Sequence, residues 1–255
     1  NIFSPDILRA DYNRVRNIMR KFNPGTDFLI TLASLRVEQI LKAGNNQYSF
    51  NLYEVTDSQR PLEIKLNRND LFVPGYIGLA LAKYDSTVTG GNGGNYLQRT
   101  FPDPNYFSGT SGSNEEHVAL NCIYNGKLSI KTEPVVRLRN LATTEMLYIP
   151  EKQEFITGTL SDQVKNEPAQ FGETPEQRGY FRLQPQPIFD GQENNSVQVD
   201  LGIGATDLIA GGFDDQGGAV DTRNVLIFKA LGFIVVNGAQ SMGRWTTEAK
   251  EKANV

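Results

Sequence analysis

The stretch of sequence from residue 118 to residue 141 reads VALNCIYNGKLSIKTEPVVRLRNL. It holds short runs of aliphatic, aromatic and β-branched residues that are bounded by Asn, Gly and Pro, a pattern typical of β-strands. The pair Asn125-Gly126 is a strong signal for a two-residue hairpin turn. We therefore predict a turn there, between a strand at Val118–Tyr124 and two strands that follow it at Lys127–Thr132 and Val135–Leu141.

The same pattern continues toward both ends of the chain. About a dozen short strands at spacings of roughly 8–12 residues, joined by long polar connections, favour β-sandwiches or jelly rolls over alternating α/β units. An eight-stranded jelly roll needs about 100 residues, so two would fit between Asp27 and Arg244. The further predicted strands are Phe28–Leu41, Tyr48–Val55, Leu62–Leu66, Tyr76–Tyr84, Tyr96–Thr100, Met146–Ile149, Tyr180–Phe189, Ser196–Leu201 and Val225–Val236.

These strands predict an all-β fold: two tandem jelly-roll β-barrels with an N-terminal amphipathic helix. Its predicted parts are a helical arm (1–26), a first jelly roll (27–125), a second jelly roll (126–245) and a C-terminal tail (246–255). A weak internal echo supports a duplication, because Leu35–Leu52 resembles Phe181–Leu201 and Arg68–Leu79 resembles Arg223–Phe233, in the same order. Chance similarity between β segments is the alternative explanation.

The first 22 residues have the signature of an amphipathic helix. Ser4 suits the N-cap, Pro5 the first helical position and Asp6 the positive end of the helix dipole. Apolar residues recur at steps of three and four, at Leu8, Tyr12, Val15, Met19 and Phe22. The other side carries five basic residues, Arg9, Arg14, Arg16, Arg20 and Lys21. We expect the basic residues to contact a membrane surface or a neighbouring subunit; packing of the helix on its own barrel is the alternative.

The composition limits the classes of function. The formal net charge is −4, so the body lacks the positive field that holds nucleic acid, and no specific nucleic acid is expected as a partner. A single cysteine, Cys122, excludes an intrachain disulfide, and a single histidine, His117, excludes a polyhistidine metal site. No apolar run approaches the roughly 20 residues that cross a bilayer, and the first residues lack the layout of a signal peptide.

Candidate catalytic and binding motifs are weak. His117 and Cys122 are five positions apart, which places them on opposite faces of a regular strand, so we expect no thiol–imidazole pair. Gly202-Ile203-Gly204 lacks the third glycine of a dinucleotide fingerprint. Three carboxylates could converge on a calcium ion: Asp214, Asp215 and Asp221. Their spacing matches no standard calcium-binding loop, and a solvated loop is the simpler interpretation. We therefore predict no enzyme activity, no cofactor and no resident metal.

A basic amphipathic arm on an acidic body with two strand series resembles, in plan, the double jelly-roll major capsid proteins of icosahedral, internal-membrane bacteriophages of the corticovirus and finnlakevirus kind. The resemblance rests on the arm at Ser4–Phe22 and on the strand series before and after Asn125-Gly126, and no short motif carries it. It implies a major capsid subunit whose homotrimers have a pseudo-hexameric outline, located in the virion and assembled in the host cytoplasm. Its implied partners are other copies, other capsid proteins and the inner viral membrane surface, which the five basic residues of the arm would face.

Other functions fit parts of the same pattern. A carbohydrate-binding or adhesin-type β-sandwich is one alternative, because aromatic residues lie near the polar glycine-rich stretches: Tyr96, Phe101, Tyr106 and Phe107. A minor virion or tail component is another. Trimer formation would favour the coat protein, whereas saturable glycan binding by a monomer would favour the sandwich.

Overall fold

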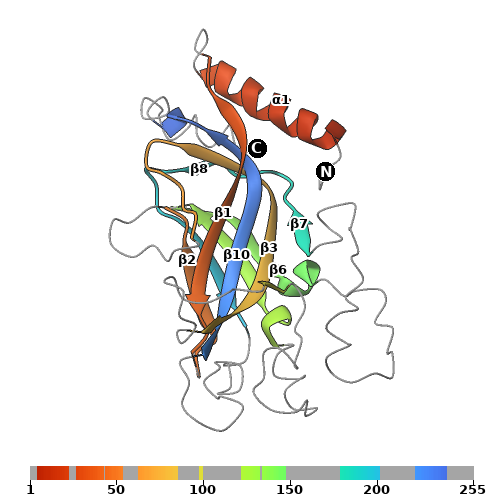
Figure 1. Ribbon diagram of the computed structural model, residues 1–255. Coiled ribbons are helices and arrows are strands. Elements are labelled where there is room, and N and C mark those ends of the chain that lie inside the picture. Colours follow the sequence, from red (N-terminus) through yellow and green to blue (C-terminus); the bar gives the residue numbers. More distant parts are fainter. Residues whose placement is uncertain are drawn as a thin grey trace.

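The computed structural model describes residues 5–22, 27–42, 44–53, 63–85, 98–99, 122–132, 134–147, 179–201 and 222–239. These residues form two curled antiparallel sheets and one N-terminal helix, α1 (Pro5–Phe22) (Figure 1). The first sheet contains β1 (Ile30–Ile40), β10 (Thr222–Val235), β3 (Leu71–Asp85), β4 (Gln98–Arg99), β7 (Tyr180–Arg182) and β8 (Phe189–Asp190). The second contains β2 (Gln47–Asn51), β9 (Asn195–Asp200), β5 (Lys127–Thr132) and β6 (Val135–Ala142). The all-β prediction is confirmed.

Successive strands alternate between the sheets in a regular way. The first sheet runs β1-β10-β3, followed by β8, β7 and β4, which pair with successive parts of the same edge of β3. The second runs β2-β9-β5-β6. The chain passes from β1 to β2, β3, β5 and β6 and returns through β7 and β8, β9 and β10. It changes sheets at each step except from β3 to the short β4, from β5 to β6 and from β7 to β8. The described strands thus form two sheets with four strand positions in each.

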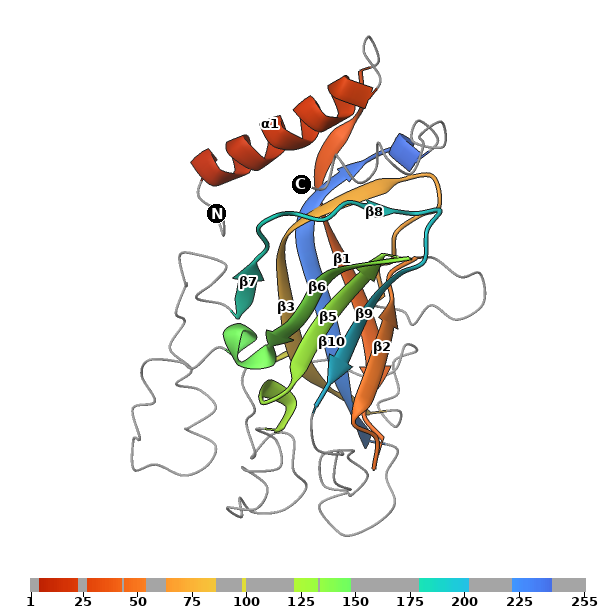
Figure 2. The same cartoon turned by 180° about the vertical axis from the view of Figure 1, so that it is seen from behind.

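One core fills the space between the sheets. Strands of the second sheet alternate buried and less buried residues; in β2, Tyr48 and Phe50 are buried between exposed neighbours. In the first sheet, β3 is buried at every position from Leu71 to Ala82. Phe50 of the second sheet lies 6.0 Å from Phe228 of the first, ring centre to ring centre. A single buried cluster includes residues of β1, β2, β3, β5, β9 and β10. The two layers face each other across this cluster (Figure 2).

The predicted boundary at residue 125 does not separate the described strands. β1 pairs with β10 along its whole length, from Ile30 opposite Val235 to Ile40 opposite Val225. β2 pairs with β9, so both sheets mix strands from the two predicted barrels. The described strands therefore form one two-sheet arrangement that draws on both predicted barrels, and they do not confirm two jelly rolls. The internal sequence similarity can be explained without a duplication. β3 pairs directly with β10 and β2 with β9, so the similar segments occupy similar environments.

The predicted hairpin at Asn125-Gly126 is also wrong. Residues Cys122–Tyr124 form a 3-10 helix, and β5 pairs with β6 and β9. A Cβ atom at position 126 would lie 2.3 Å from the backbone oxygen of Asp200, so the glycine permits a close approach of two backbones. A second 3-10 helix, η2 (Thr143–Met146), replaces the start of the strand that was predicted at Met146–Ile149.

Helix α1 lies across one end of the first sheet, on the face that points away from the core (Figure 1). Val15 and Met19 are buried there against residues of the sheet and its ends, and Leu8, Tyr12 and Ile18 pack around them. The Tyr12 ring meets Phe233 edge-on at 5.9 Å. The residues of the body in this cluster are Leu71, Val73, Ile188, Phe233, Val235 and Ala239, with Phe28 and Ile30 at its margin.

Candidate functional site

The candidate site is the basic face of helix α1, which we define by its exposed cations Arg9, Arg16, Arg20 and Lys21. Arg16 and Arg20 follow Arg9 by seven and eleven positions. At about 100° per residue, the three arginines fall within about 20° of one line along the helix and span about 16 Å. The helix therefore presents a row of positive charge on the side that does not pack on the sheet.

Two charged residues of the helix turn toward the body. Asp11 is buried, and its carboxylate lies 3.7 Å from the guanidinium of Arg182 on β7. Arg14 is half-buried and donates a long hydrogen bond of 3.5 Å to the side-chain oxygen of Gln186. Because Asp11 is withdrawn, Asp6 is the one exposed carboxylate among the described residues of α1. Since Arg14 also turns toward the body, the solvent side keeps the net positive charge of the helix sequence, with four exposed cations against one exposed carboxylate.

The apolar face of α1 has a partner within the same chain. The structure places it on the sheet, with Val15 1% and Met19 3% exposed. Packing of the helix on its own barrel, the alternative named for the arm, is the observed arrangement for this apolar face. Insertion into a bilayer would require an available apolar face. The basic face remains available for an external partner, and its contact with one stays a prediction.

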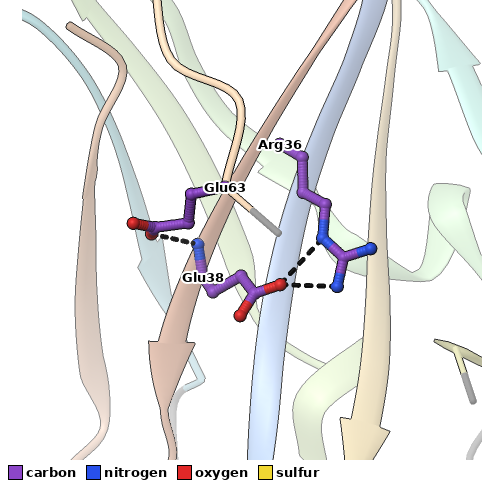
Figure 3. A network of polar contacts seen from close by, with 3 residues as sticks. All are labelled: Arg36, Glu38 and Glu63. Atoms are coloured by element: carbon purple, nitrogen blue, oxygen red, sulfur yellow. Dashed lines mark hydrogen bonds and ion pairs between the residues drawn. The ribbon is translucent and has the colours of Figure 1, made fainter. Parts of the chain in front are cut away.

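A second polar cluster, with Arg36, Glu38 and Glu63, lies at the edge of β1 (Figure 3). The Arg36 guanidinium donates through its Nε atom to the Glu38 carboxylate at 2.8 Å, and the Glu38 backbone N–H donates to the Glu63 carboxylate at 2.9 Å. Lys65 pairs with Glu63 at 3.1 Å. Ile64 and Arg36 exchange two backbone hydrogen bonds of 2.8 Å. This network fixes the segment 63–66 along the lower part of the β1 edge.

The charges of this cluster are held in place by the sheet. The Glu38 side chain is fully buried, and its Oε2 atom makes no hydrogen bond to a described residue. Lys229 of β10 lies directly opposite Arg36. Burial, and secondly the positive charge of Arg36, lowers the pKa of Lys229 to about 8. The cluster brings together two carboxylates and three cations, and its hydrogen bonds and ion pairs hold the segment 63–66 to the edge of β1.

Most of the other candidate residues lie outside the described parts of the chain. This holds for His117, for the glycine motif at 202–204 and for the carboxylates Asp214, Asp215 and Asp221, as well as for the aromatic residues at 96, 101, 106 and 107. Cys122 begins the 3-10 helix η1. Within the described ranges, no group of three or more His, Cys, Asp or Glu residues is placed to hold a metal ion. The single described α-helix is too polar to cross a membrane.

Sequence patterns indicated the basic residues of α1 but not the cluster at β1. Arg36 and Glu38 alternate with Leu35 and Val37, which is an ordinary pattern for a strand with one buried face. Glu63 comes from a distant segment, so its position beside Glu38 depends on the tertiary fold.

Comparisons with known proteins gave no family model that matches the chain and no match among curated proteins.

Proposed function

We propose that this protein is a structural virion protein, a subunit that assembles with copies of itself into a closed capsid shell. The observation that carries the proposal is the strand order of the two described sheets, β1-β10-β3 and β2-β9-β5-β6, which we interpret as one jelly roll. Viral capsid subunits are one of the main groups of proteins built on double-sheet jelly rolls, and lectins are another. The polar cluster at β1 is consistent with a structural protein, because it links β1 to the segment 63–66.

The proposal differs in one respect from the double jelly-roll resemblance. A pseudo-hexameric trimer requires two jelly rolls in each subunit, whereas the described strands supply one. We therefore propose the shell-forming role and homotrimer formation, but not the pseudo-hexameric outline.

We further propose that the basic face of α1 contacts an anionic surface inside the shell, such as lipid headgroups. Each cation near an anionic membrane contributes about 1 kcal/mol of attraction. Since the apolar face of α1 is packed on the sheet, the contact would be electrostatic and would weaken as salt is added. Vesicles of anionic lipid should then bind the protein at low salt and release it at high salt, and replacing Arg9, Arg16 and Arg20 by Gln should abolish binding.

The test of the shell-forming role is electron microscopy of the concentrated protein, with a glycan-binding assay on the same preparation. Ring-shaped oligomers or closed particles without glycan affinity are expected. A protein that stays monomeric and binds a glycan saturably would overturn the capsid proposal in favour of a carbohydrate-binding sandwich.

A further inference from the structure

The upper edge of β1, from Ile30 to Ser34, pairs with no other strand among the described residues. The backbone N–H of Arg36, at an even position, points away from β10 and donates to Ile64. Leu29 and Leu41, at odd positions, make their backbone hydrogen bonds on the β10 side instead. Backbone groups at even positions of β1 therefore point to the free edge. Arg36 and Glu38 are occupied there by the segment 63–66. No described residue bonds to this edge at the even positions before Arg36, which are Ile30, Leu32 and Ser34.

The other described edges carry features that hinder pairing with a second chain. β6 has two arginines, Arg137 and Arg139, and its pairing with β5 contains two register shifts. At β2, Leu66 donates to the backbone of Leu52, and the Gln39 side chain donates to the carbonyl of Ser49. The far edge of the first sheet is divided among the short strands β4, β7 and β8. Charges, bulges and short strands are the usual protection of sheet edges.

The open edge lacks this protection and exposes apolar side chains. Residues 30–35 of β1 carry no charge. Leu32 is 52% exposed, and Leu29 at the start of the strand is 63% exposed. An uncharged strand edge with exposed leucines is a template for another strand.

We propose that this edge pairs with the same edge of a second copy, antiparallel, across a two-fold axis that passes through Leu32. The inference rests on the proposed shell-forming function and names one of its subunit contacts. Only one register joins all three open positions of both copies: Leu32 opposite Leu32 and Ile30 opposite Ser34. Each such pair exchanges two hydrogen bonds, which gives about six in total. No like charges meet in this register, whereas self-pairing of β6 would bring arginines together.

The contact by itself is small. Five residues on each side bury far less than the roughly 1,600 Å² of a typical stable interface. The isolated pair therefore forms weakly and is strengthened when many subunits assemble. A covalent trap is the suitable test, because it captures a weak contact without requiring a stable dimer.

The experiment uses Leu32→Cys in a Cys122→Ser background, oxidised at high protein concentration. Directly opposed residues of a hydrogen-bonded pair have Cα atoms about 5.5 Å apart, within the range of a disulfide. We expect a disulfide-linked dimer from this variant and none from Val136→Cys, whose position on β6 is also exposed. Adding Ser34→Pro removes one edge donor without touching the β10 side, so it should abolish the cross-link while the thermal unfolding midpoint stays close to that of the parent.

Each outcome separates this contact from the shell-forming role. A cross-link that Ser34→Pro abolishes supports the contact, whatever the size of the assembly. Larger assemblies without the cross-link overturn the contact and leave the capsid proposal standing. A cross-linked dimer without larger assemblies supports the contact and argues against the shell. A monomer without a cross-link overturns both.

Discussion

Replacing Met19 by Ala tests whether α1 belongs to the folded body. Met19 is 3% exposed and packs in the cluster between α1 and the first sheet. The substitution removes three buried heavy atoms and leaves a cavity, and Met→Ala changes in cores cost about 2–5 kcal/mol. The cluster covers one face of one helix, so we expect about 2–3 kcal/mol. At about 2–4 °C per kcal/mol for a domain of this size, the unfolding midpoint should fall by about 4–12 °C.

Thermal unfolding followed by circular dichroism measures this loss, and Asn17→Ala is the matched control. Asn17 is exposed on the same helix, so its substitution should change stability by less than about 0.5 kcal/mol. An unchanged midpoint for Met19→Ala would refute the packing of α1 on the sheet. It would restore the interpretation in which the apolar face is reserved for a membrane or another subunit.

Three further substitutions test the interior of the sandwich. Glu38→Gln leaves the largely buried Arg36 without its counter-charge and should cost about 2–3 kcal/mol in urea unfolding, whereas no loss would show that the pair is dispensable. The pKa of Lys229 is lowered from 10.5 to about 8 in the folded protein. Between these two values the unfolded chain binds a proton that the folded chain does not, so the free energy of unfolding rises with pH in this range. Lys229→Met should therefore be stabilising below pH 8, with an advantage that shrinks toward pH 10.5; an advantage that does not vary with pH would contradict this. Gly126→Ala places a methyl group 2.3 Å from the Asp200 oxygen and should abolish or severely reduce soluble folded protein, and a near-normal midpoint would disprove the close approach.

Local patterns predicted the elements well. The N-terminal helix was expected to Phe22 and ends there, and the strands at Lys127–Thr132 and Val135–Leu141 were placed within one residue. These elements have a clear period of 3.6 or 2 and are bounded by Pro, Gly or Asn, so their signal is contained in neighbouring residues.

The pairing of strands could not be predicted in the same way. β1 and β10 are separated by nearly the whole described chain, and nothing in either sequence specifies the other as its partner. The Asn125-Gly126 pair suggested a hairpin because Asn-Gly is common in such turns, whereas here the glycine serves a close contact with Asp200. The Asp11 side chain likewise turns toward Arg182 because of where α1 docks. Which charged residues of the helix are exposed therefore depends on the tertiary structure and could not be predicted from the helix sequence.

The measurement that tests the shell-forming proposal most directly is the mass of the native protein in solution, by sedimentation or native mass spectrometry over a range of concentrations. A single chain has a mass of 28.3 kDa. We predict discrete closed assemblies at integer multiples of this mass, trimers among them, that grow in abundance with concentration. A single species of 28.3 kDa at every concentration and salt condition would contradict the account.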